Sequence, residues 1–190
     1  MAVAVQTLLH DKPLRWASLA IETDIAAIEA EWRAFEARAL VTPYQAYGWV
    51  RAFVETVGAA HGMEFRYALL RDGEGALCAL LPLVITRRSG IRFAEFIGGK
   101  HANYHMGLYA PEFAAGLDAG SAVAMLTEIG RTVGGLDALI FVNQPAQWQG
   151  TANPAALLAA GPSPSRAYKL ALISGDRKST RLNSSHRCIS

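Results

Sequence analysis

The fold is decided by residues 65–97, which read FRYALLRDGEGALCALLPLVITRRSGIRFAEFI. The residues of this segment follow the period of two that is typical of β-strands. Two turns that contain glycine, at 72–75 and 89–90, divide the segment. The three strands predicted in this way are 65–71, 76–87 and 91–97. The unbroken apolar run Ala79-Leu80-Leu81 indicates that the middle strand is buried on both faces.

Helical periodicity lies on both sides of these strands. Ile25, Ile28, Trp32, Phe35 and Ala39 recur at spacings of three and four, which places them on one face of a helix that Thr23 or Asp24 would cap. Further elements are predicted as a strand at 14–21, helices at 45–60 and 117–133, a buried strand at 138–142, a short helix at 154–160 and a strand at 166–173. This order predicts one α/β layered domain, with a mixed, mostly antiparallel central sheet flanked by helices.

The end of the chain has a different character from the rest. Residues 176–186 read DRKSTRLNSSH, which resembles one reading frame of a common short-read sequencing adapter. We therefore expect residues 176–190 to be a non-native tail, residues 14–175 to be the natural domain without its own C-terminus, and residues 1–13 to be a leader. The tail takes four of the 18 basic residues and one of the 16 acidic residues, so the net charge without it changes from +2 to −1.

Composition excludes several classes of protein. A hydrophobic fraction of 52% with a charged fraction of 18% supports a core and argues against disorder. No apolar run reaches the length of a membrane span, and no signal peptide is evident at the N-terminus, which favours a cytoplasmic protein. The corrected charge removes the argument for nucleic acid as a partner. Cys78 is the one cysteine outside the tail, so neither an internal disulfide nor a zinc site is expected.

The richest polar stretch is Gly98-Gly99-Lys100-His101-Ala102-Asn103-Tyr104-His105. Two glycines after a strand allow successive N–H groups to converge in a nest that binds anions, and Lys100 and His101 would add charge. A glycine turn followed by an exposed polar loop is the simpler explanation. His101 and His105 are four residues apart, which suits a metal ion only on a helix, so no metal site is expected.

A second polar cluster, Asn143-Gln144-Pro145-Ala146-Gln147-Trp148, follows a predicted strand. Ligands of α/β sheets tend to lie beyond the carboxyl ends of strands, and amides with an indole suit a sugar or amide substrate; loop capping is the alternative. The residues predicted to line an acceptor cleft are His101, Asn103, Tyr104, Gln144 and Trp148. No Gly-x-Ser-x-Gly elbow or carboxylate pair is present, so no catalytic residue is assigned.

Several segments together resemble the CelD-like acetyltransferases, bacterial proteins of the GNAT superfamily that are linked by name to cellulose biosynthesis. The resemblance covers about residues 14–174. The matching segments are Glu31-Trp32, Thr42-Pro43-Tyr44-Gln45 with Trp49 and Phe53, Ala79-Leu80-Leu81-Pro82-Leu83, Phe96-Ile97-Gly98-Gly99-Lys100-His101-Ala102-Asn103-Tyr104, Asn143-Gln144-Pro145, Trp148, Asn153-Pro154 and Ser163-Pro164-Ser165.

The resemblance implies that the chain is the N-terminal half of a longer protein with two GNAT-like halves, similar in plan to the FemABX transferases. The intact enzyme would move an acetyl or other acyl group from acyl-CoA to an amine or hydroxyl of a small molecule or saccharide. The acyl-CoA site is expected mainly in the missing C-terminal half, so the fragment is expected to be inactive and to bind no cofactor. A cut between the halves would expose a strand edge or an apolar face.

The nearest match to an acyl-CoA phosphate loop is Arg131-Thr132-Val133-Gly134-Gly135-Leu136. Its last residue is leucine where the loop needs glycine or alanine, and it ends a predicted helix instead of starting one. We therefore interpret it as a helix cap.

The sequence is also compatible with two functions other than acyl transfer from acyl-CoA. The first is a non-catalytic binding or scaffold domain that uses a GNAT-like fold to recognise a partner or glycan. The second is a FemABX-like transfer from aminoacyl-tRNA, which requires a basic surface that the corrected net charge does not support.

Overall fold

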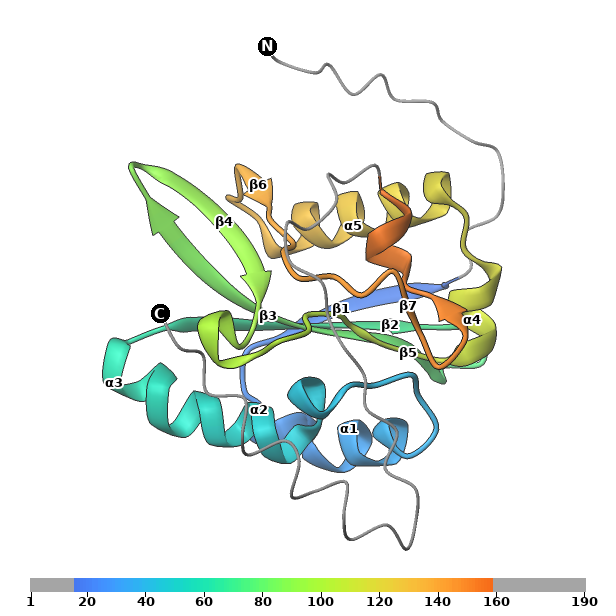
Figure 1. Ribbon diagram of the computed structural model, residues 1–190, viewed down its shortest axis with the longest axis horizontal. Helices are drawn as coiled ribbons and strands as arrows, with labels where there is room; N and C mark the ends of the chain where they lie inside the picture. The colour runs from blue at the N-terminus through green and yellow to red at the C-terminus, as the bar shows by residue number, and fades with distance from the viewer. Residues whose placement is uncertain (1–15, 159–190) are drawn as a thin grey trace, which may run out of the picture. The chain divides into compact units, whose positions relative to one another are not determined.

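Three long antiparallel strands form the centre of a mixed sheet in the computed structural model, which describes residues 16–158 (Figure 1). The strands are β1 (Ser18–Glu22), β2 (Glu64–Arg71), β3 (Leu77–Arg88), β4 (Ile91–Phe96), β5 (Leu108–Tyr109) and β6 (Ala138–Leu139). Their order is β1-β2-β3-β4-β6, with β5 also paired to β3. Neighbours are antiparallel except β4 and β6, which are parallel. The predicted α/β class and the mixed, mostly antiparallel sheet flanked by helices are confirmed.

Strand β3 changes its partner part-way along one edge. Its first residues pair with β5 through Ala79 and Leu80, whereas its second half, from Leu83 onward, pairs with β4. Pro82 lies between these two regions, and its carbonyl accepts a hydrogen bond from the Ile97 N–H at 3.1 Å. A proline is tolerated in this central strand because its missing N–H falls where one partner strand ends and the other begins.

Helices cover both faces of the sheet, as Figure 1 shows. One face carries α1 (Glu29–Glu36) and a continuous helical run of α2 (Tyr47–Phe53), a π-helical segment η3 (Val54–Gly58) and α3 (Ala59–His61). The other face carries α4 (Pro111–Gly116) and α5 (Ala119–Val133). The short elements are 3-10 turns η1 (Ala26–Ile28), η2 (Pro43–Gln45), η4 (Gly99–His101) and η5 (Pro154–Leu157) and a hairpin of β7 (Gln147–Trp148) and β8 (Thr151–Ala152).

The first helical face matches its prediction. Asp24 Oδ1 accepts a hydrogen bond from the Ala26 N–H at 2.9 Å at the entry of the turn that precedes α1. Ile25, Ile28, Trp32 and Phe35 are buried, and Ala39, beyond the end of α1, is half-buried. The period of three to four residues therefore located the side of this segment that packs on the sheet.

The structure differs from the prediction in three places. The helix predicted at 117–133 is confirmed as α5, which begins at Ala119, but a separate helix that was not predicted, α4, begins at Pro111 and ends before the extended residue Leu117. The polar loop at 143–153 contains the β7–β8 hairpin. The buried strand predicted at 138–142 is the two-residue strand β6, and Ile140 and Val142 are 37% and 50% exposed, since β6 lies at the edge of the described sheet.

Other predictions fall partly or wholly outside the described residues. These are the leader at 1–13, the first residues of the strand at 14–21, the end of the short helix at 154–160, the strand at 166–173, the end of the domain at 175 and the tail at 176–190.

Candidate functional site

Two loops meet beyond the carboxyl ends of the parallel strands β4 and β6. The loop after β4 runs to His105, whose N–H donates a hydrogen bond to the Asn143 carbonyl, at 3.2 Å, in the loop after β6. Hydrogen bonding between the two strands extends as far as Ile140, whose N–H donates to the Ala94 carbonyl at 2.9 Å. Crevices at the carboxyl ends of adjacent parallel strands are where α/β sheets commonly bind ligands.

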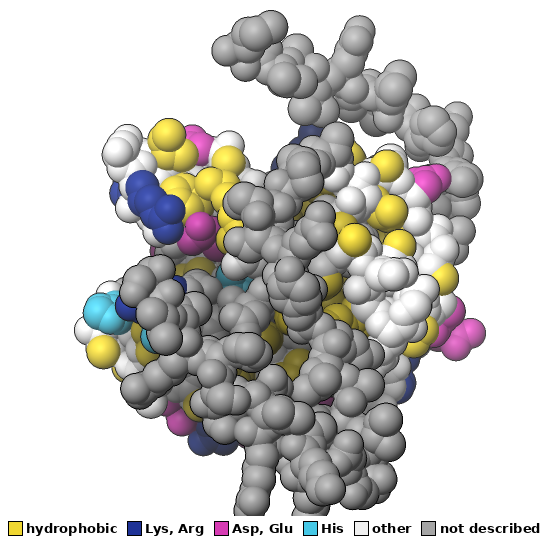
Figure 2. All heavy atoms as spheres, viewed as in Figure 1, with side chains coloured by type: hydrophobic (Ala, Val, Ile, Leu, Met, Phe, Trp, Pro, Cys, Tyr) yellow, Lys and Arg dark blue, Asp and Glu magenta, His cyan; other side chains and the backbone are white. Residues whose placement is uncertain are grey.

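This junction encloses a hollow of about 240 Å³, which we call the β4–β6 hollow. Its lining consists of the charged and polar residues Arg88, Glu95, Lys100, His105 and Asn143, the apolar residues Phe96, Ile140 and Val142, and Gly99. Over the β3–β4 hairpin, Figure 2 shows exposed hydrophobic side chains beside basic and acidic ones. The hollow therefore combines two cations, one carboxylate and an imidazole in a small space.

His105 is the chemically distinctive member of this lining. The residue is 3% exposed, and its Nε2 atom is buried without a hydrogen-bond partner. Burial lowers the pKa of His105 below its ordinary value of 6.5, and the Gly99 and Val142 carbonyls and the Glu95 carboxylate only partly offset this effect. The imidazole is therefore neutral at neutral pH, with an uncommitted ring nitrogen that can accept a proton.

The depressed pKa of His105 predicts a loss of stability in acid. The unfolded chain binds a proton at this residue near the ordinary pKa of 6.5, whereas the folded chain resists protonation to lower pH. The contribution of His105 to the free energy of unfolding is thus complete above this pH and declines as the pH falls below it. Urea unfolding of the wild type and of His105→Gln across this range measures the effect. A pH dependence that is identical in the two proteins contradicts it.

The loop that carries His105 begins with Gly98, whose backbone conformation suits glycine. Its φ of +131° is in a region that L side chains rarely adopt, and a Cβ atom would lie 2.6 Å from Ala102 Cβ and 3.2 Å from the Trp49 ring. Gly98→Ala is therefore expected to lower the free energy of unfolding by about 1–3 kcal/mol, from strain and overpacking together. The control is Gly99→Ala, since a Cβ there meets nothing within 4 Å. Equal losses of stability in the two variants, measured in urea, would contradict the contribution of the close contact.

None of the five residues predicted for an acceptor cleft lines the hollow. The Tyr104 and Trp148 rings are 5.7 Å apart between centroids, and Trp148 Nε1 donates to the Val41 carbonyl at 3.0 Å. Asn103 Nδ2 donates to the Tyr44 hydroxyl at 3.0 Å. His101 is exposed, with its ring 6.1 Å from that of Phe53.

Gln144, the fifth predicted residue, has its amide committed within its own loop. Its Nε2 donates to the Val142 carbonyl at 3.2 Å, and its Oε1 accepts a hydrogen bond from Asn153 Nδ2 at 3.0 Å. The buried Asn153 side chain also donates to the Pro145 carbonyl at 3.0 Å and accepts from the Ala155 N–H at 3.2 Å. In this loop the two amides stabilise the chain after β6, as the loop-capping alternative expects.

The candidate site lies between the two loops that the sequence singled out, but the sequence did not assign His105, Lys100, Asn143 or Glu95 to a cleft. His105 was part of the polar stretch that the sequence singled out. Its distinguishing property is burial without a partner for Nε2, which no sequence pattern displays.

The nearest match to an acyl-CoA phosphate loop is a helix cap in the structure. Helix α5 ends at Val133, and the Gly134 N–H donates back to the Gly130 carbonyl at 3.2 Å. The Gly134 and Gly135 carbonyls both accept from Arg92 Nη1, at 2.7 and 3.1 Å. A pyrophosphate needs converging N–H groups at the start of a helix, so these residues do not fit that ligand.

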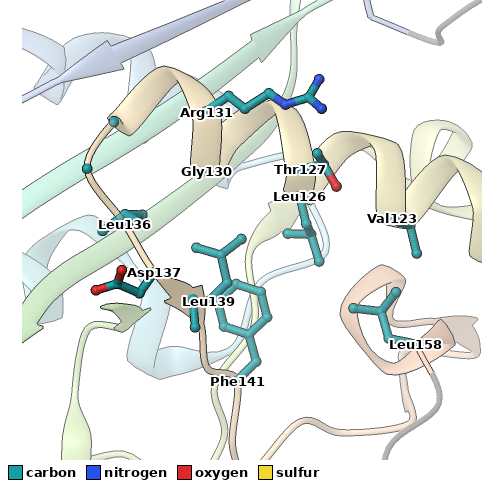
Figure 3. A pocket seen from close by; sticks show the side chains of 13 residues that line it. Val123, Leu126, Thr127, Gly130, Arg131, Leu136, Asp137, Leu139, Phe141 and Leu158 are labelled. Atoms are coloured by element: carbon teal, nitrogen blue, oxygen red, sulfur yellow. The ribbon is translucent and has the colours of Figure 1, made fainter. Parts of the chain in front are cut away.

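A larger and shallower hollow of about 650 Å³ lies between α5 and the β6 segment (Figure 3). Leu126, Leu139 and Phe141 gather beneath the helix in this view, and Leu158 lies at one side. Its carboxylate, Asp137, accepts a hydrogen bond from the Arg92 N–H at 2.7 Å. This hollow is mainly apolar and lacks a group that is free to move a proton, so we place the candidate site in the β4–β6 hollow.

Two kinds of feature are absent from the described residues. No group of three or more His, Cys, Asp or Glu side chains within residues 16–158 is arranged to hold a metal ion. In the same range, no helix combines the length and the hydropathy that a membrane span requires.

Comparisons with family models, curated proteins and solved structures found no match to this chain.

Proposed function

We propose that this chain is part of a GNAT-type acyltransferase, which moves an acetyl or other acyl group from a CoA thioester to an amine or hydroxyl of a small molecule or saccharide. The β4–β6 hollow receives the acceptor. The observation that carries this proposal is that His105 lines a small polar hollow, is buried and neutral, and has an Nε2 atom without a hydrogen-bond partner. The resemblance of residues 14–174 to CelD-like acetyltransferases supports the same reaction.

The reaction needs a base for the acceptor, and His105 meets this requirement. As the acceptor nitrogen or oxygen attacks the thioester carbonyl, its bond to that carbon forms and the bond from carbon to sulfur breaks. His105 takes the proton that the acceptor loses, and the departing thiolate is protonated in turn. A base that is neutral near pH 7 can do this without first losing a proton of its own.

The acyl donor is supplied from outside the described residues in this proposal. Gly98 and Gly99, which follow β4, are the glycine pair from which the sequence suggests an anion-binding nest. In the structure they belong to a 3-10 turn, in which the Gly98 carbonyl accepts a hydrogen bond from the His101 N–H at 2.9 Å. Together with the cap at Gly134 and Gly135, this arrangement supports the expectation that acyl-CoA binds mainly to a second half of the intact protein.

The test starts from the source gene, read past codon 175, and from the protein that it encodes. That protein is incubated with acetyl-CoA and a panel of amines, amino acids and saccharides, and released thiol is measured. The proposal expects thiol release that depends on an acceptor. A stop codon directly after codon 175, or no acceptor-dependent release with acetyl-CoA or longer acyl-CoA, would overturn the proposal and favour a binding domain.

A further inference from the structure

The β4–β6 hollow is lined by charged residues of both signs. Arg88 and Lys100 contribute positive charge, and Glu95 contributes a carboxylate. Within residues 16–158 no carboxylate pairs with the Lys100 ammonium. The hollow therefore holds one cation that a ligand can pair with, next to a second cation that is mostly exposed.

Glu95 is only weakly committed to its neighbours. Its Oε2 atom is 3.4 Å from Arg88 Nη2 and 3.4 Å from the Thr86 hydroxyl, both long for hydrogen bonds to a carboxylate. The Glu95 side chain is 22% exposed, whereas that of Arg88 is 67% exposed. A positively charged ligand group can bind this half-buried carboxylate without breaking a short ion pair.

We propose that the β4–β6 hollow binds a small amino acid, with its carboxylate against Lys100 and Arg88 and its ammonium against Glu95, beside His105. Phe96, Ile140 and Val142 provide an apolar wall for its side chain. A volume of about 240 Å³ is below the usual range for drug-sized ligands, which begins at about 300 Å³, and this favours a molecule as small as an amino acid. This inference rests on the proposed function, because it identifies the acceptor of that reaction.

The acyl-transfer step balances with this acceptor. The ammonium gives one proton to the His105 imidazole and becomes an amine. The amine nitrogen then attacks the thioester carbonyl, the new carbon–nitrogen bond forms, and the carbon–sulfur bond breaks. The second proton passes from nitrogen to the departing CoA thiolate, and the imidazolium returns its proton to water. The product is an N-acyl amino acid, with CoA as the free thiol.

Binding of L-valine to the 190-residue chain, measured by calorimetry without any acyl-CoA, tests the inference. Two analogues each lack one charged group: 2-methylpropan-1-amine has no carboxylate, and 3-methylbutanoate has no amine. We expect valine to bind, and each analogue to bind about tenfold more weakly or worse, because each loses a charge-assisted contact. Absence of valine binding, or an analogue that binds as tightly as valine, would overturn the proposal.

Matched variants locate the site. Lys100→Gln and Glu95→Gln are each expected to weaken valine binding by about tenfold. Arg87→Gln removes an exposed arginine next to Arg88 that does not line the hollow, and it should leave binding unchanged. Equal effects of Arg87→Gln and Lys100→Gln would place any binding elsewhere. Circular dichroism melting curves establish that each variant folds.

The outcome also separates this inference from the proposed function. Thiol release with other acceptors, but no valine binding, leaves the acyltransferase standing and removes the amino-acid acceptor. Valine binding in a protein without acyltransferase activity removes the proposed reaction and retains an amino-acid site.

Discussion

Replacement of His105 by alanine in the protein encoded by the full source gene is expected to lower kcat/KM for acyl transfer by about 10²–10⁴-fold, the usual contribution of a general base. The physical reason is the state of the imidazole, which burial keeps neutral and whose Nε2 has no competing partner. Without this group the acceptor must lose its proton to water. Thiol release at saturating acyl-CoA and varied acceptor concentration measures the change.

The pH profile distinguishes a base from a structural residue. In the wild type, kcat/KM is expected to fall as the pH drops through the lowered pKa of His105, because the protonated imidazole cannot act as a base. His105→Gln retains a polar side chain but cannot take the proton, so this variant should lose both the activity and the acid limb attributable to His105. The matched control is His101→Ala, which removes an exposed imidazole from the same loop. Equal losses in His101→Ala and His105→Ala would be incompatible with the role of His105.

Replacement of Trp32 by alanine is expected to lower the free energy of unfolding by about 3–5 kcal/mol, the usual cost of deleting a buried aromatic side chain. Trp32 is fully buried, and its ring packs edge-on against Tyr47 and Tyr67, with centroids 5.7 Å away in each case. Its Nε1 also donates to the Gln45 carbonyl at 3.2 Å. Urea unfolding measures the loss as a shift of the midpoint at unchanged slope.

This core position also connects to the loop of the candidate site. The buried Gln45 side chain donates from Nε2 to the Tyr104 carbonyl at 3.1 Å, one residue before His105. Trp32→Phe keeps an aromatic ring but removes the hydrogen bond to Gln45, so it should cost less than Trp32→Ala. The surface control is Arg33→Ala on the same helix, where loss of an exposed ion pair with Glu29 and of a cation–π contact with Tyr47 should cost about 1 kcal/mol. A cost for Trp32→Ala no larger than this control would contradict the packing argument.

The three central strands were predictable because their information is local. The apolar run of β3 and the turns on either side of it set the register of two hairpins through residues that are close in the sequence. The Asp72 Oδ1 atom, for example, accepts hydrogen bonds from Glu74 and Ala76 N–H groups at 3.0 and 2.9 Å within its own turn. Such turns depend on side chains only a few residues away.

The short strands and the β6 edge were less predictable for the opposite reason. Residues 138–142 are apolar like a buried strand, yet only Ala138 and Leu139 pair, with Phe93 and Ala94 of β4. Whether an apolar segment is buried depends on which element packs on it, which periodicity alone does not contain. The β7–β8 hairpin has two residues in each strand, too short for a pattern to emerge.

By itself, the sequence determined the α/β class, the three consecutive strands and the apolar face of the first helix, and it singled out the two polar loops that contribute to the candidate site. Each depends on the order of neighbouring residues, through a repeat of two or of three to four positions or through a glycine turn. Only the tertiary structure decided that His105, rather than its neighbour His101, is the candidate base. Its pKa and its unpartnered nitrogen arise from burial where the loop after β4 meets the loop after β6, and burial is a property of the packed chain.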